Sequence, residues 1–171
     1  MSRIEVKLEP LTRAAFAPFG DVIEKVGAAT FETNQGTAVR YHDLARIDLA
    51  GSEGRTLVSI FEATVAAELP FRLRLLERHP ISSQAFVPLG ETSFVVVVAP
   101  GGNQPDLGCI RAFMTAGRQG INFHPATWHH PLIALQRAEF LVIDRDGPGP
   151  GFDQDYEEVA LEAQCVFIRA S

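Results

Sequence analysis

Residues Ser83 to Ala99 read SQAFVPLGETSFVVVVA and predict two short strands around a tight turn. Ser83 to Val87 and Phe94 to Ala99 are apolar and rich in valine and phenylalanine, whereas Pro88-Leu89-Gly90-Glu91 is typical of a turn. The apolar run Phe94 to Pro100 is far too short to cross a bilayer. The stretch therefore indicates a buried strand pair in a β-sheet core.

Working outward, the same pattern of short strands and Gly/Pro turns continues on both sides. A short helix is predicted over Thr12 to Ala17, with Thr12 as its N-cap, and residues 27–38 and 146–151 are predicted to be loops. Residues 156–169 fit either a final strand or a helix that closes one end. Further strands are predicted at Val22-Ile23, Thr56 to Ala63, Phe71 to Leu75, Ile110 to Thr115, Ile121 to His124, Leu132 to Leu135 and Glu139 to Ile143.

Many short strands without an alternating βαβ pattern predict an all-β sandwich or barrel. The length of 171 residues suits one domain, which we expect to cover residues 1–171. A small closed barrel encloses a single interior pocket, and a small ligand would bind there.

Charge and cysteine usage narrow the class of protein further. The net charge of −6 argues against a nucleic-acid partner, because such proteins carry basic surfaces. The first residues, MSRIEVKLEP, lack the apolar core of a signal peptide, and no membrane span is predicted. Cys109 and Cys165 are far apart and are expected to be reduced thiols. We therefore expect a cytoplasmic protein.

Three of the five histidines lie in one stretch, Asn122 to Pro131, beside the only tryptophan, Trp128. In an extended segment His124 and His130 would share one face and His129 would lie on the other. All three could enter one pocket only if a turn at Pro125 intervened. The density of histidines indicates a candidate site, while Trp128 fits a pocket wall or a core position.

A second cluster begins at Glu77. Glu77 and His79 lie two residues apart, so on a strand both side chains point the same way. A metal ion or a small polar substrate would use this geometry. The alternative is a charged strand end just before Pro80.

These two clusters resemble the two motifs of the cupin superfamily. Glu77-x-His79-x4-Gln84-x5-Gly90 is similar to the first motif, and Pro125-Ala126-Thr127-Trp128-His129 is similar to the second. The resemblance implies a cupin-type (RmlC-like) β-barrel or jelly roll with short peripheral helices. It also implies a metal site made by Glu77, His79, Gln84 and His129. Glu77 stands where the family usually has histidine, and Gln84 where it usually has glutamate, which is a weaker ligand set.

A more specific resemblance, to the ureidoglycolate lyase family, extends over nearly the whole chain. Its members are typically homodimers that cleave (S)-ureidoglycolate into glyoxylate and urea in allantoin (purine) degradation, and nickel is associated with the activity. The resemblance therefore implies a carbon–nitrogen lyase that uses a divalent metal and no organic cofactor. The segments that carry it are Leu11 to Ile23, Asn34-x-Gly36, Arg40 to Leu44, Leu76 to Pro80, Gln84 to Pro88, Phe94 to Val98, Pro105 to Leu107, Arg111 to Phe113, Gly120 to His124, Trp128 to Leu132 and Ile143 to Arg145.

The chemistry of ureidoglycolate sets what such a site must contain. Loss of the hydroxyl proton lets a C=O bond form while the C–N bond breaks, so a base, an acid and a partner for the carboxylate are needed. His79 or Glu77 could be the base and His129 the acid, which leaves their order open. For substrate binding, the candidates are Gln84 for the ureido group, Arg40 or Arg78 for the carboxylate, His124 for orientation and Trp128 for the wall.

Two other functions fit the same barrel. A different cupin lyase or hydrolase could act on a small hydroxy acid, for example a ureidoglycolate amidohydrolase that releases ammonia in place of urea. A non-catalytic cupin could bind a small acid. Product analysis separates these readings.

Overall fold

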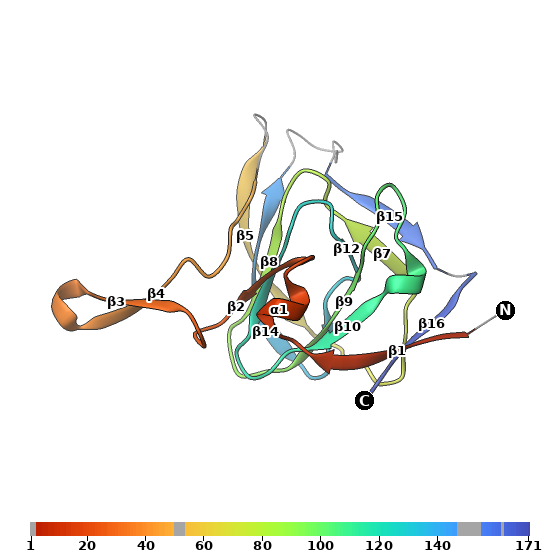
Figure 1. Cartoon of the computed structure of the whole chain (residues 1–171), viewed down its shortest axis with the longest axis horizontal. Coiled ribbons are helices and arrows are strands. Elements are labelled where there is room, and N and C mark those ends of the chain that lie inside the picture. Colours follow the sequence, from red (N-terminus) through yellow and green to blue (C-terminus); the bar gives the residue numbers. More distant parts are fainter. Residues whose placement is uncertain (1–2, 50–53, 147–154, 162) are drawn as a thin grey trace.

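The structure is a computed structural model that describes residues 3–49, 54–146, 155–161 and 163–171. Two curved sheets face each other and enclose the interior, and a two-stranded arm extends away from them (Figure 1). In the described ranges no helix is long and apolar enough to cross a membrane. The all-β architecture expected from the sequence is confirmed.

The larger sheet has nine strands and contains the residues around Glu77 and His129. Along the sheet the order is β15 (Glu157–Ala160), β7 (Leu75–Arg78), β12 (Trp128–His129), β9 (Phe94–Ala99), β10 (Arg111–Met114), β1 (Arg3–Pro10), β16 (Cys165–Arg169) and β6 (Phe71–Arg72), while β13 (Ile133–Ala134) also pairs with β9. β1 runs parallel to both β10 and β16, although the sequence shows no βαβ pattern.

The smaller sheet has five strands, and β5 and β2 form its edges. Its order is β2 (Gly20–Ile23), β11 (Gly120–Phe123), β8 (Gln84–Pro88), β14 (Ala138–Asp146) and β5 (Arg55–Ala63). The arm consists of β3 (Ala29–Thr33) and β4 (Ala38–His42), joined by the 3-10 turn η1 (Asn34–Gly36). A second 3-10 turn, η2, spans Leu107–Cys109.

The alternation of β9 decides which face of the large sheet is interior. Phe94, Val96 and Val98 enter a phenylalanine-rich core between the two sheets, which includes Phe123. Val95, Val97 and Ala99 enter a second core on the opposite face, together with Trp128. A strand buried on both faces is expected to be apolar throughout, as the run of valines in β9 is.

Several sequence predictions are confirmed with small shifts of their ends. The helix is α1 (Arg13–Phe16), and the hydroxyl of its N-cap Thr12 accepts from the Ala15 amide. The predicted strands Thr56 to Ala63, Ser83 to Val87, Phe94 to Ala99, Ile110 to Thr115, Ile121 to His124, Leu132 to Leu135 and Glu139 to Ile143 correspond to β5, β8, β9, β10, β11, β13 and β14.

Four predictions need correction or lie out of reach. Residues 27–38 are not an irregular loop, because they contain β3 and most of the arm. β1 was not predicted, and Phe71 to Leu75 is divided between β6 and β7. Residues 156–169 form two strands, β15 and β16, where one strand or a helix was expected. Of the predicted loop 146–151, all but Asp146 lies outside the described residues.

Candidate metal and active site

Glu77 and His129 are brought together by the pairing of β7 with β12. The two residues are direct partners in this antiparallel pair, and His129 is also opposite Val98 of β9. Because directly opposite residues share a face, both side chains point into the interior between the sheets. His79 lies two residues after Glu77, just past the end of β7, on the same side.

The three side chains form a compact group that could hold a metal ion. One donor atom from each of Glu77, His79 and His129 lies within 4.8 Å of the others. The Nε2 atom of His129 is 3.5 Å from Oε1 of Glu77, and the His129 side chain is 1% exposed. The sequence prediction that these residues converge from two motifs is therefore matched by the geometry.

Both histidine rings are held through Nδ1, which leaves Nε2 directed at the centre. Nδ1 of His79 is 2.7 Å from the Asp155 carbonyl oxygen, and Nδ1 of His129 is 2.8 Å from that of Thr127. A carbonyl can only accept, so Nδ1–H donates in each case, and in a neutral ring the lone pair is then on Nε2. Among the described residues, neither buried Nε2 atom has a hydrogen-bond partner.

Asp155 holds the chain that follows His79. Its carboxylate accepts from the backbone amides of Ile81 and Ser82 at 2.6 and 3.2 Å, and from the Ser82 hydroxyl at 2.5 Å. The same residue supplies the carbonyl that fixes the His79 ring. On the other side, the His129 ring stacks on Phe123 with centroids 4.1 Å apart and planes 14° apart. Both rings are thus constrained before any ligand arrives.

The electrostatics favour an ionised carboxylate in this group. Burial acts to raise the pKa of Glu77, but the nearby imidazole of His129, with smaller contributions from His79 and Tyr156, outweighs it and leaves that pKa lowered. The neighbouring His130 has a lowered pKa, chiefly because of burial. Glu77 is therefore the anionic member of the group.

Sequence reasoning missed two polar side chains beside these three. Glu158 of β15 is the direct partner of Glu77, and Glu157 that of Arg78, so Tyr156 lies opposite His79. The Tyr156 hydroxyl donates to Glu158 at 2.5 Å, and burial followed by the two nearby glutamates raises the pKa of Tyr156. The Asp-Tyr-Glu-Glu run at 155–158 does not alternate between apolar and polar residues, so no local pattern marks these side chains.

Gln84 reaches the interior from the opposite sheet. It is the β8 partner of Phe123, and its amide nitrogen lies 3.3 Å from Oδ2 of Asp144 on β14. The Gln84 Oε1 and Asp144 Oδ1 atoms are buried without a partner among the described residues. Gln84 therefore offers a free acceptor, although none of its described hydrogen bonds joins it to the other three.

Arg78 and Trp128 lie on the reverse face of the same strands. The Arg78 guanidinium pairs with Glu157 at 2.5 Å, donates to the Gly102 carbonyl at 2.6 Å and stacks over Trp128. Trp128 is 1% exposed in the second core, and its indole N–H also donates to Gly102. The structure does not bring either residue to the group of Glu77, His79 and His129.

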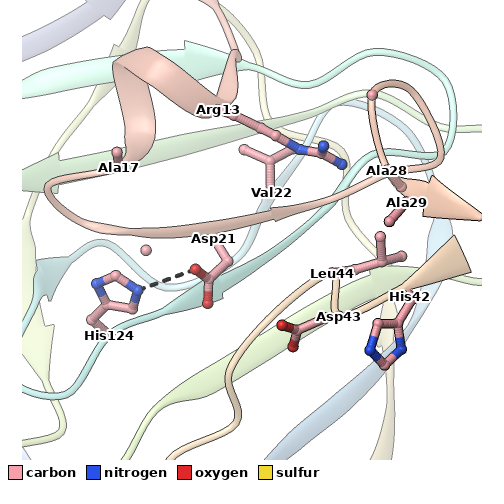
Figure 2. A pocket seen from close by; sticks show the side chains of 12 residues that line it. Arg13, Ala17, Asp21, Val22, Ala28, Ala29, His42, Asp43, Leu44 and His124 are labelled. Atoms are coloured by element: carbon pink, nitrogen blue, oxygen red, sulfur yellow. Dashed lines mark hydrogen bonds and ion pairs between the residues drawn. The ribbon is translucent and has the colours of Figure 1, made fainter.

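His124 belongs to a separate cavity of about 510 Å³ beside β2 and the base of the arm. Figure 2 shows its ring turned toward Asp21, and the two side chains are 3.3 Å apart. Arg13, His42 and Asp43 line the same cavity. His124 therefore lies in a different part of the structure from His129, which belongs to the group with Glu77 and His79.

Arg40 is exposed on β4, opposite Phe31 of β3. Figure 1 shows this arm directed away from the two sheets. Within its own chain Arg40 is therefore remote from Glu77, His79 and His129, and its predicted contact with a carboxylate stays a prediction.

The donor set fits a divalent metal ion. Two imidazole nitrogens and one carboxylate form a mixed nitrogen and oxygen set, which suits nickel, iron or zinc better than magnesium. The two unpartnered Nε2 atoms are the observation that supports this fit, since buried polar atoms are normally satisfied.

The family model and the similar sequences agree with each other. The model of the family described as ureidoglycolate lyase matches residues 3–167. A ureidoglycolate lyase of Pseudomonas aeruginosa (strain LESB58) is 49% identical over 164 residues, covering 93% of this chain and 96% of the relative. One from Burkholderia mallei (strain NCTC 10229) is 53% identical over 150 residues, covering 87% of each chain. A solved dTDP sugar isomerase of Desulfovibrio desulfuricans G20 aligns with a TM-score of 0.42 and 16% identity, over 84% of this chain and 85% of that one.

Proposed function

Because this chain belongs to the ureidoglycolate lyase family, we propose that it cleaves (S)-ureidoglycolate into glyoxylate and urea in allantoin degradation. The observation that carries the proposal within the structure is the convergence of Glu77, His79 and His129, with two unpartnered Nε2 atoms. The reaction needs no redox step and no water, so a site made of proton carriers and a Lewis acid is sufficient.

We propose that Glu77 moves the proton, because an ion on the Nε2 atoms of His79 and His129 would occupy the lone pairs with which those rings accept a proton. The substrate hydroxyl gives its proton to the carboxylate oxygen of Glu77 that an ion would leave free, as the substrate C–O bond becomes C=O. The C–N bond breaks at the same carbon, and Glu77 returns the proton to the nitrogen that leaves with urea. One proton is taken and one returned, so the reaction balances. In a site without an ion, His79 and His129, whose Nε2 lies 3.5 Å from Glu77, are the alternative proton carriers.

We assign the divalent ion to Glu77, His79 and His129, with Gln84 as a fourth donor and nickel as the ion expected from the family. When bound, such an ion lowers the pKa of an alcohol at its side and stabilises a developing oxyanion. The fixed rings of His79 and His129 hold their Nε2 atoms in place, which reduces the cost of ordering the site. No organic cofactor enters this scheme.

The remaining parts of the proposal concern substrate contacts, assembly and location. Gln84 supplies an amide for the ureido group, and an arginine is needed for the carboxylate. Residues 1–171 form one domain, supported by the fact that β9 contributes to both cores. The protein is a homodimer, as expected for the family, and a cytoplasmic location is supported by its two free cysteines.

A turnover assay on racemic ureidoglycolate tests the proposal directly. Urea, glyoxylate and ammonia are measured separately, before and after treatment with a chelator. Equal amounts of urea and glyoxylate are expected, and activity should disappear with the chelator and return with one divalent ion. Ammonia in place of urea would show a hydrolase, and the absence of turnover with every metal would leave a barrel that only binds a small acid.

A further inference from the structure

Among the described residues, the β3–β4 arm finds little surface of its own chain to rest on. All five residues of β3 are exposed, and the large apolar side chains Phe31 and Val39 are each 54% exposed. The two strands pack on each other and on η1, and Figure 1 shows them standing away from the barrel. An isolated two-stranded hairpin is marginally stable at best in water, so this arm requires a partner surface.

A matching apolar surface lies on the outside of the five-stranded sheet. β5 is nine residues long and forms an edge of that sheet, and its outward residues Val58 and Ile60 are 67% and 62% exposed. Their register partners on β14 are Ile143 and Leu141. A long apolar edge strand invites pairing with another chain, and natural proteins cover such edges.

The two surfaces belong to one chain, so a second copy can satisfy both at once. We call the surface made by Val58, Ile60, Leu141 and Ile143 the outer strip. In a two-fold dimer the arm of each protomer covers the outer strip of the other, and both contacts form together. A partner of another kind would cover one surface and leave the second exposed. The occupant that these surfaces select is therefore another copy of this chain.

The site around Glu77, His79 and His129 needs a cationic partner for the substrate carboxylate, and the arm carries one. Substrate carries a carboxylate, but Arg78 is held on the reverse face by Glu157 and Gly102. The side chain of Arg40 makes no hydrogen bond or ion pair with any described residue, and it lies opposite Phe31 on the same face of the arm. Gln84 and Asp144 lie at the site end of β8 and β14, whose outer surface forms the strip. Each five-residue strand is about 16 Å long, so an arm along this strip can reach the rim.

We infer that the arm of one protomer docks on the five-stranded sheet of a second copy and places Arg40 where its guanidinium binds the substrate carboxylate in that copy's site. The role of Arg40 rests on the proposed lyase function, because that function supplies the substrate carboxylate. The docking of the arm rests only on the exposed arm and the outer strip. Arg40 acts as a binding residue, and each active site is completed by two chains.

Complementation between two inactive variants tests the shared site. Arg40→Ala and His79→Ala chains carry different tags, are expressed together, and the mixed dimer is isolated by two successive affinity steps. Each parent homodimer is expected to lose at least about tenfold in kcat/KM, since each removes a charged or proton-carrying contact. In the mixed dimer one site has both an intact His79 and an intact Arg40 from the partner, so it should show about half of wild-type activity.

A site completed within one chain gives the opposite result, because both sites of the mixed dimer then carry one defect and the dimer is as inactive as its parents. That outcome, or an Arg40→Ala homodimer with wild-type kcat/KM, overturns the inference. If the wild-type chain does not turn over ureidoglycolate, the proposed function fails and the role of Arg40 fails with it.

The docking of the arm has a test that does not depend on activity. Phe31→Asp and Ile60→Asp are expected to convert the dimer to a monomer by light scattering, with an unchanged far-ultraviolet circular dichroism spectrum. Leu89→Asp alters another exposed apolar side chain, outside both surfaces, and should remain a dimer. A monomeric wild-type chain, or Phe31→Asp and Ile60→Asp variants that stay dimeric, would contradict the docking.

Discussion

The strands that hold Glu77, His79 and His129 and the arm that holds Arg40 differ in what surrounds them. On β7 and β12 the polar side chains are buried or partly buried against neighbours of their own chain, whereas β3 and β4 contact little beyond each other. Residues in the first region can be assigned to a site from one chain. Residues in the second have a defined environment only when a second copy is present.

The sharpest contrast concerns two histidines of the same sequence cluster. His129→Gln removes a buried Nε2 from the centre, so kcat/KM should fall by about 10³-fold, the scale of a lost proton carrier. His124→Gln alters the separate cavity near β2 and should change kcat/KM by less than about threefold, as expected for a residue that does not contact substrate. Steady-state kinetics and metal content of both proteins provide the measurement. Equal losses would mean that the two regions act as one site.

Asp155 tests whether the rigidity of the site comes from its own chain. Asp155→Ala removes three hydrogen bonds to a carboxylate, so the free energy of unfolding should fall by about 3 kcal/mol, and metal should bind more weakly because His79 is less well fixed. Urea denaturation and metal titration measure the two effects. Asp155→Asn keeps one acceptor, so its free energy of unfolding should lie between those of Asp155→Ala and the wild type. An Asp155→Ala protein as stable as the wild type would show that the Asp155 carboxylate does not hold the segment after His79.

Arg78 and Arg40 are expected to differ in what their loss changes: protein stability for Arg78 and substrate binding for Arg40. Arg78→Ala breaks the pairing with Glu157 and the stacking on Trp128, and should lower the free energy of unfolding by about 2 kcal/mol. Arg40→Ala should change that quantity by less than about 0.5 kcal/mol when protein concentration is held constant, while KM rises. Chemical denaturation and kinetics on both variants decide this. A destabilised Arg40→Ala with unchanged KM would make Arg40 structural.

The smallest expected effect is a change in how the stability of the metal-free protein depends on pH. The pKa of Glu77 is lowered in the folded state, so its contribution to stability is complete above the usual value near 4.5. That contribution is lost as pH falls through the folded pKa. The wild type should therefore lose stability more steeply than Glu77→Gln below pH 4.5, measured by thermal unfolding at several pH values. Parallel curves would show that the His129 contact does not stabilise the carboxylate.

The sequence predicted those parts of the fold that depend on local patterns. The valine run of β9 and the Pro-Leu-Gly turn predict buried strands, and the spacing of Glu77 and His79 predicts a shared face. β1 was missed although Arg3 to Glu9 alternates between polar and apolar residues. Its parallel pairing with β10 and β16 joins residues more than 100 positions apart, which no local pattern reports. The arm was read as a loop because Gly, Ala, Thr and Asn dominate it. Tyr156 and Glu158 were missed for a related reason, since their place beside Glu77 follows only from the β15–β7 pairing.

The position of β1 has a consequence for synthesis of the chain. Arg3 pairs with Cys165 and Lys7 with Arg169, so β1 is synthesised long before β16, the strand with which it pairs. Asp155, which holds the loop after His79, also emerges late. Until then the apolar strands of the large sheet leave the ribosome without their final neighbours, a period in which aggregation competes with folding. A stalled or truncated chain lacking β16 would therefore be a substrate for chaperones and proteases before it could become an enzyme.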